Sequence, residues 1–120
     1  MATILVIDDQ EPIRALLRAA LGGDGHEVLE ASNGLLGLER YRDRAADLII
    51  TDMAMPEMNG LEMMLELNRC FPKVKIIAMS GGPEREGGLQ AAKLLGARQT
   101  FQKPFDMRAL LDAVRYELAH

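Results

Sequence analysis

Short apolar runs alternate with stretches of helical periodicity five times along the chain. We expect strands at residues 3–8, 26–31, 47–52, 74–79 and 98–103. The first, third and fourth runs are almost continuously apolar, which is typical of strands buried on both faces. The second run carries His26, Glu27 and Glu30, so we expect it at an edge of the sheet. Strands that alternate with helices predict an α/β fold with a parallel sheet.

Four of the helices between these strands have clear start or stop signals. Pro12 fits the opening turn of the first helix, where its missing N–H costs nothing, and Gly22-Gly23 ends that helix. The second helix is expected to open at Asn33-Gly34 and the third after Asn59-Gly60. The last helix follows Asp106, which is a good N-cap residue.

The fourth helix has the weakest pattern. Gly81-Gly82 and Gly87-Gly88 interrupt the segment in which it should form. Each glycine inside a helix costs about 1 kcal/mol relative to alanine. We therefore expect regular helix only from near Leu89.

A doubly wound sheet of five parallel strands in the order 2-1-3-4-5 accounts for this alternation. Its crossovers are right-handed, and its strand order reverses beside the first strand. Ligands bind such sheets outside the carboxyl ends of the strands, at that reversal. Polar residues stand at the carboxyl ends of the expected strands: Asp8, Asp9, Asp52, Ser80 and Lys103. We expect these side chains to meet at one edge of the sheet, within a single domain over residues 1–120.

Three carboxylates crowded at one edge need a counter-charge. Like charges about 4 Å apart repel by about 4 kcal/mol per pair at an effective dielectric constant of about 20. Oxygen ligands without a nearby histidine or thiolate favour Mg²⁺ or Mn²⁺ over Zn²⁺. The ammonium group of Lys103 adds attraction for a phosphoryl group bound to such a cation. Asp8 and Asp9 alone could simply cap a helix, but the joint placement of all four charges predicts a cation and phosphoryl site.

Composition excludes several other classes of protein. The chain has 120 residues, of which 48% are hydrophobic and 27% charged, as in an ordinary globular domain. Its net charge of -4 argues against a nucleic-acid partner. It has no apolar run long enough to span a membrane, and we expect no signal peptide because Met1-Ala2-Thr3 leads directly into the first expected strand. Cys70 is the only cysteine, so a disulfide framework is excluded and a cytoplasmic location is expected. We expect Cys70 to be buried.

Several motifs together resemble the receiver domain of two-component response regulators, across essentially the whole chain. The sequence Val6-Ile7-Asp8-Asp9 resembles the acidic pair of that family, and the segment 52–60 resembles its phosphoacceptor loop. Met79-Ser80 resembles its hydroxyl position, and Lys103-Pro104-Phe105 its lysine–proline motif, in which the peptide bond is typically cis. The resemblance implies the flavodoxin-like three-layer fold.

The resemblance also implies a role for each residue. Asp52 would accept a phosphoryl group from a histidine kinase or a histidine phosphotransfer protein. Magnesium would be bound directly by Asp9, Asp52 and the backbone carbonyl of Ala54, and through water by Asp8. Lys103 would pair with the phosphoryl group, and Ser80 would donate a hydrogen bond to it. No turnover of a separate substrate is expected.

A downstream protein would dock on the face made by the fourth helix, the fifth strand and the fifth helix, as in relatives of the family. The domain is expected to be a monomer or weak dimer. Because Met1 directly precedes the first expected strand, we favour a stand-alone receiver over a piece of a longer regulator.

Three positions depart from the family pattern. Thr100 stands where the family usually has an aromatic residue that moves inward on activation, and Phe101 follows it on the opposite face of the strand. Gly81-Gly82 follow the hydroxyl residue, and Ala54 has no polar group to orient a water molecule. We therefore expect activation to reorder residues 81–88 instead.

Three alternatives remain open at this point. A phosphorylation-independent interaction module would have the same fold, but it would not need a cluster of repelling acids. A flavin-binding protein would need small hydroxyl residues and glycines after the first strand, where this chain has acids. An aspartate-based phosphatase would need a second acid two residues after Asp52, where this chain has Ala54.

Overall fold

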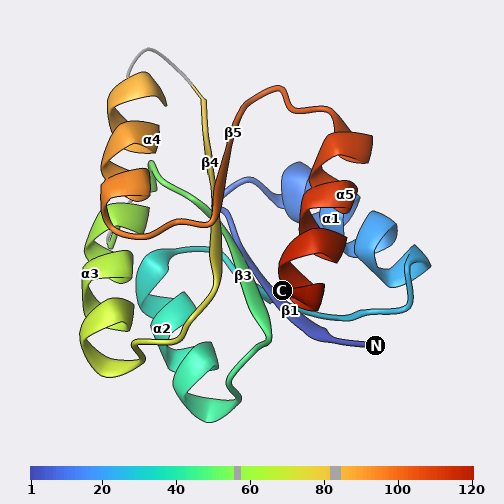
Figure 1. The fold of residues 1–120 in the computed structure, drawn as a ribbon, viewed down its shortest axis with the longest axis horizontal. Coiled ribbons are helices and arrows are strands. Elements are labelled where there is room, and N and C mark those ends of the chain that lie inside the picture. Colours follow the sequence, from blue (N-terminus) through green and yellow to red (C-terminus); the bar gives the residue numbers. More distant parts are fainter. Residues whose placement is uncertain (56–57, 82–84) are drawn as a thin grey trace.

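In the part of the chain that the structure describes, the alternation of apolar runs and helical periods forms five strands and five helices (Figure 1). The computed structural model describes residues 1–55, 58–81 and 85–120. The strands are β1 (Thr3–Ile7), β2 (Glu27–Ala31), β3 (Leu48–Asp52), β4 (Ile76–Ser80) and β5 (Gln99–Gln102). The helices are α1 (Glu11–Gly23), α2 (Gly34–Asp43), α3 (Gly60–Cys70), α4 (Arg85–Leu94) and α5 (Met107–Ala119). Within the described residues, no helix is long and apolar enough to cross a membrane.

All four strand pairings are parallel, and the strand order is β2-β1-β3-β4-β5. This confirms the doubly wound sheet and the edge position of β2. The registers that set the site are those of the central strands: Ile7 pairs with Thr51, and Asp52 with Met79. They bring the carboxyl ends of β1, β3 and β4 side by side. The expected strands at 74–79 and 98–103 begin later in the structure than the sequence suggested.

Helices cover both faces of the sheet, with α2, α3 and α4 on one face and α1 and α5 on the other (Figure 1). Neighbouring residues of a strand point to opposite faces, so each central strand contributes to two cores. Leu5, Ile7 and Ile49 belong to the core under α2, α3 and α4. Ile4 and Ile50 belong to the core under α1 and α5. Two full cores hold the strand ends, and with them the site, in fixed positions.

Helix α4 begins at Arg85, so the prediction that regular helix would begin near Leu89 was wrong. The helix runs through Gly87-Gly88, although glycine has a low intrinsic helix propensity. Leu89 and Ala92 are buried in the core beneath α4. Tertiary packing therefore overrides the local propensity at the glycines.

Cys70 is exposed, so the prediction that it would be buried was also wrong. Helix α3 ends at Cys70, after its buried residues Met63 and Leu67. The next residue, Phe71, packs against the core instead, with its ring centroid 4.9 Å from that of Tyr41. At this end of the helix it is Phe71 that packs against the core, and the Cys70 thiol stays at the surface.

Candidate functional site

The carboxyl ends of neighbouring strands bring the acidic residues together. Asp8 and Asp9 directly follow β1, and Asp52 is the last residue of the adjacent strand β3. One carboxylate oxygen from each of these three residues lies within 4.8 Å of the other two. Asp8 and Asp52 are buried, whereas Asp9 is exposed. The site is therefore a partly open cluster of three acids.

The side chain of Lys103, which follows β5, reaches across the sheet edge into this cluster. Its Nζ atom lies 2.8 Å from Asp8 Oδ2 and 3.4 Å from Asp52 Oδ2. It also donates a hydrogen bond to Gln10 Oε1 at 3.4 Å. The peptide bond that follows Lys103 is cis, as the resemblance implied. One ammonium group thus serves two buried carboxylates.

Asp52 lies in an environment that disfavours its charged form. Burial raises the pKa of the Asp52 carboxyl above its ordinary value, and the nearby charge of Asp8 raises it further. Lys103 and the backbone N–H of Ala54, which donates to Asp52 Oδ1 at 3.4 Å, act in the opposite direction. The net upward direction means that one lysine does not fully compensate the cluster.

The cluster has the chemistry of a site for a hard divalent cation. When all four groups are ionised, three carboxylates and one ammonium have a net formal charge of about -2, which a divalent cation would neutralise. The donor atoms are all oxygens, which Mg²⁺ and Mn²⁺ prefer. Asp9, Asp52 and Ala54 line the same cleft, together with Lys103 and Gly81. These residues fit a bound magnesium ion.

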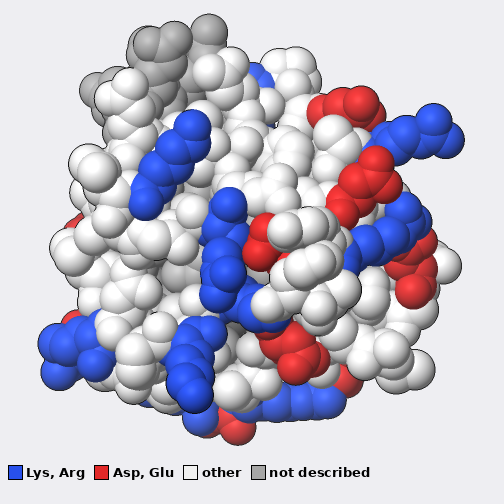
Figure 2. All heavy atoms as spheres, in the orientation of Figure 1, with Lys and Arg blue, Asp and Glu red and all other residues white. Residues whose placement is uncertain are grey.

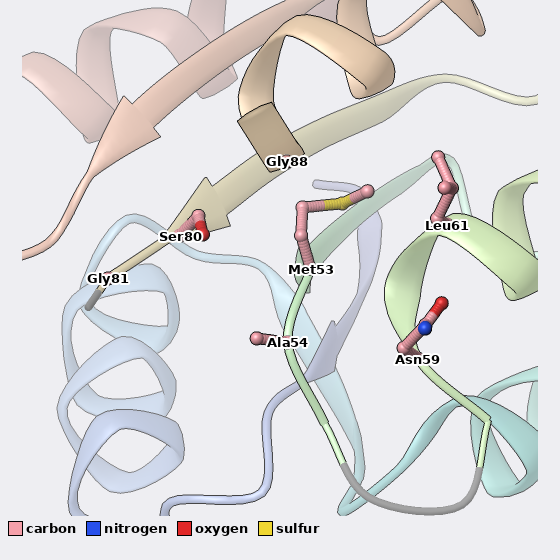
Figure 3. Close-up of a pocket in the computed structure, with 7 residues that line it drawn as sticks. All are labelled: Met53, Ala54, Asn59, Leu61, Ser80, Gly81 and Gly88. Carbon is pink, nitrogen blue, oxygen red and sulfur yellow. The ribbon is translucent and has the colours of Figure 1, made fainter. Parts of the chain in front are cut away.

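Ser80, at the end of β4, lies in a second cavity that adjoins this cleft (Figure 3). Its hydroxyl-bearing side chain points toward Met53 and Ala54, which follow β3. Gly88 closes the opposite side, where an added Cβ would lie 3.6 Å from Ser80 Oγ. Ala54 and Gly81 line both the cleft and the cavity. The hydroxyl therefore stands beside the acidic cluster without being part of it.

Sequence reasoning missed two residues that contact the cluster. Gln10 contacts Lys103 and donates its backbone N–H to Asp8 Oδ1 at 2.9 Å. Arg14 donates to the backbone carbonyl of Asp8 at 2.6 Å. The only sequence feature that could have indicated them is their distance from the acid pair: Gln10 directly follows Asp9, and Arg14 lies one helical turn further on. Their side-chain directions could not be read from the sequence.

This sheet order, with an acid pair, a strand-end aspartate and a lysine at one edge, defines a receiver-type domain. The family model described as "Response regulator receiver domain" matches residues 4–115, and the chain belongs to that family. Receiver domains accept phosphoryl groups from histidine kinases or phosphotransfer proteins, and they bind Mg²⁺ at an aspartate cluster such as this one. They are not ordinary enzymes. The chain is thus a phosphoryl-accepting receiver domain of two-component phosphorelay signalling, as predicted.

Individual relatives agree with this assignment. The chain is 35% identical over 112 residues to sporulation initiation phosphotransferase F of Bacillus subtilis, covering 93% of this chain and 90% of that protein. It is 38% identical over 117 residues to the DNA-binding transcriptional regulator NtrC of Azospirillum brasilense, covering 98% of this chain but 24% of that protein. The crystal structure of a response regulator receiver domain protein from Clostridium thermocellum superposes with a TM-score of 0.89 at 31% identity, covering 99% of this chain and 95% of that one.

The family assignment also decides among the alternatives. A receiver and a flavin-binding protein can share this topology, but the matched family is that of receivers. Nothing in the comparisons favours a phosphorylation-independent module.

Proposed function

We propose that Asp52 is the phosphoacceptor of this receiver domain. The observation that carries the proposal is its placement: it is buried at the end of β3, in the acidic cluster and 3.4 Å from Lys103 Nζ. An Asp52 oxygen would attack the phosphorus atom of a phosphohistidine. The new O–P bond forms as the N–P bond breaks, and the histidine nitrogen leaves with the bonding electron pair. Such a transfer needs positioning and charge neutralisation more than covalent assistance from the protein.

We assign the metal site to the carboxylates of Asp8, Asp9 and Asp52 and the backbone carbonyl of Ala54, for Mg²⁺ or alternatively Mn²⁺. The bound cation supplies positive charge that offsets the charge of the phosphoryl oxygens. Asp9 and Asp52 bind directly in this assignment, and Asp8 through water. The donor set, which consists of oxygen atoms, and the net negative charge of the cluster support this assignment.

Lys103 and Ser80 complete the proposed site. Lys103 Nζ already lies between Asp8 and Asp52, so a short movement brings it to a phosphoryl oxygen on Asp52. The Ser80 hydroxyl donates a hydrogen bond to another phosphoryl oxygen. The movement of Lys103, which follows β5, and the new hydrogen bond of Ser80, at the end of β4, start the conformational switch. The domain would catalyse only its own phosphorylation and dephosphorylation.

The downstream partner is proposed to be a protein that docks on the face formed by α4, β5 and α5. Leu94 is 88% exposed and Tyr116 is 54% exposed, which supplies apolar contact area on both helices. On this face, Lys and Arg side chains lie beside α4 and around the start of β5, with Asp and Glu side chains next to them (Figure 2). We propose a cytoplasmic location, where the free thiol of Cys70 needs no oxidising compartment, and a monomer or weak dimer.

Phosphorylation by a small-molecule donor tests the phosphoacceptor directly. Incubation with acetyl phosphate or phosphoramidate and Mg²⁺ should increase the intact mass by one phosphoryl group, and Asp52→Asn should abolish the increase. Asp112→Asn, which alters an exposed aspartate on α5, is the matched control and should keep it. A mass increase that survives in Asp52→Asn would move the phosphoacceptor elsewhere. No increase in the wild type would favour the phosphorylation-independent module.

A further inference from the structure

Arg14 joins three elements of the structure beneath the acid pair. Its guanidinium donates to the backbone carbonyl of Asp8 at 2.6 Å, to Glu11 Oε2 at 2.6 Å and to Glu30 Oε1 at 3.3 Å. These acceptors belong to the β1–α1 loop, to α1 and to the edge strand β2. The Arg14 side chain is only 15% exposed, and its contacts with Asp8 and Glu30 are partly buried, whereas Glu11 is an exposed partner. Three hydrogen bonds fix the orientation of the guanidinium group, because its donors lie in one plane in a fixed geometry.

The carbonyl that Arg14 holds belongs to the peptide group between Asp8 and Asp9. A peptide group is planar, so fixing the carbonyl of Asp8 also fixes the direction in which the chain enters Asp9. Asp8 itself has other anchors, because its N–H donates to the Ala31 carbonyl at 3.1 Å and its Oδ2 accepts from Lys103. Asp9 is exposed, so its position depends more on this peptide plane.

The charge of Arg14 would have the opposite effect on a bound cation. A guanidinium near the cluster repels a divalent ion, so its removal would strengthen cation binding if charge alone mattered. Glu11 and Glu30 pair with Arg14 and offset this repulsion. Arg18 pairs with the same two acids, at 4.0 Å and 2.6 Å, but its described contacts do not include Asp8. The two arginines thus share both acidic partners, but only Arg14 is described in contact with the Asp8 carbonyl, and Arg14 is also less exposed than Arg18, 15% against 50%.

We propose that Arg14 is a positioning residue for the metal site, which acts by fixing the Asp8–Asp9 peptide and thereby orienting the Asp9 carboxylate. The proposal rests on the assignment of Asp9 as a magnesium ligand. Glu30 supports it from β2 by holding the guanidinium in place. Groups that orient metal ligands from the next layer typically contribute about 10- to 100-fold to metal affinity.

The test is a calorimetric titration of the unphosphorylated protein with MgCl₂. Arg14→Ala should weaken Mg²⁺ binding about tenfold, whereas Arg18→Ala should leave it unchanged. Arg14→Lys should be intermediate, because one ammonium group cannot reach all three acceptors. Unchanged or tighter binding in Arg14→Ala would overturn the proposal. Thermal melts check that each variant is folded, and Glu30→Gln, which loosens Arg14 without touching Asp8, replaces Arg14→Ala if that variant unfolds.

A second readout needs no metal at all. The Gln10 N–H donates to Asp8 Oδ1, so its exchange with solvent reports the order of the β1–α1 loop. In metal-free protein, exchange at Gln10 should be faster in Arg14→Ala than in the wild type and in Arg18→Ala. Equal rates in all three would overturn the positioning role. Failure of the wild type to bind Mg²⁺ would refute the proposed metal site on which the proposal rests, and an exchange difference would then show only that Arg14 orders the β1–α1 loop.

Discussion

Asp52 combines two demands that conflict in a buried side chain. The proposed chemistry needs a charged carboxylate, but burial and the neighbouring Asp8 favour its neutral form. Lys103 relieves part of this conflict at a distance of 3.4 Å. The remaining cost is borne by the stability of the whole domain, which is a common feature of functional sites.

The raised pKa of Asp52 predicts how Asp52→Asn changes stability with pH. Below the ordinary pKa of 3.8, the carboxyl is neutral in both the folded and the unfolded chain. As the pH rises through the interval between the ordinary and the raised pKa, the unfolded chain loses its proton first, so the free energy of unfolding falls. At neutral pH without divalent cations, Asp52→Asn should therefore be more stable than the wild type, by about 1 kcal/mol.

Urea denaturation with a chelator at two pH values measures this difference. The gain should vanish at a pH below 3.8, where neither form of residue 52 is charged. Asp112→Asn is the control, because that aspartate is exposed and should change stability by less than about 0.5 kcal/mol at either pH. A loss of stability in Asp52→Asn at neutral pH would contradict the argument from burial.

Residues at the ends of strands were the predictable part of the site. Asp8, Asp52 and Lys103 are located by strand periodicity alone, because parallel strands end at a common edge. Gln10 and Arg14 were not predictable in this way. Their contacts depend on side-chain rotamers and on the angle between α1 and the sheet, which no periodicity encodes.

At the scale of elements, the junction between β3 and α3 lacks space for a side chain. An added Cβ at Gly60 would lie 2.5 Å from the backbone oxygen of Asp52 and 2.7 Å from Met53 Cα. The helix begins here with a capping box, in which Asn59 and Glu62 exchange hydrogen bonds. Because the clash is with backbone, it cannot be relieved by rotation of a side chain.

Gly60→Ala should therefore destabilise the domain by about 1–3 kcal/mol, the range typical of overpacked sites. Gly22→Ala is the control, because this change should not lower the free energy of unfolding. Nothing lies within 4 Å of a Cβ built at Gly22, so this change in α1 should be neutral or stabilise by up to about 1 kcal/mol. Chemical denaturation of both variants provides the comparison. Equal effects of the two alanines would show that the backbone contact at Gly60 is relieved at little cost.

The elements themselves were predictable to different degrees. The central strands followed from their continuous apolar runs, and α5 from its N-cap at Asp106 and its apolar period. The start of α4 at Arg85 did not follow, because the low helix propensity of Gly87-Gly88 predicted a later start. The packing of Leu89 and Ala92 in the core stabilises the helix nevertheless. The exposure of Cys70 did not follow either, because the next residue, Phe71, packs against the core at the end of α3 instead of Cys70.

At the scale of the whole molecule, β5 leads to Lys103 and places neighbouring side chains on opposite faces of the sheet. Thr100 faces a groove beside Gln90 and Lys93 of α4. Phe101 packs against the core that contains Leu110 and Val114 of α5. It therefore cannot act as the aromatic residue that the family usually has at the position of Thr100. A change that begins at Ser80 and Lys103 is therefore expected to pass through α4. The prediction that residues 81–88 reorder falls partly on residues 82–84, which lie outside the described part of the chain.

Hydrogen exchange with and without beryllofluoride, an acyl-phosphate mimic, tests this path. With Mg²⁺ present, the mimic should change amide protection across residues 81–95, because Ser80 and Gly81 line the same cavity as Gly88 of α4. Protection in Met107–Ala119 should change little, since α5 packs on the opposite core. Asp52→Asn with the same additions is the control and should show neither change. Altered protection in α5 alone would show that the signal leaves the site through Phe101 instead.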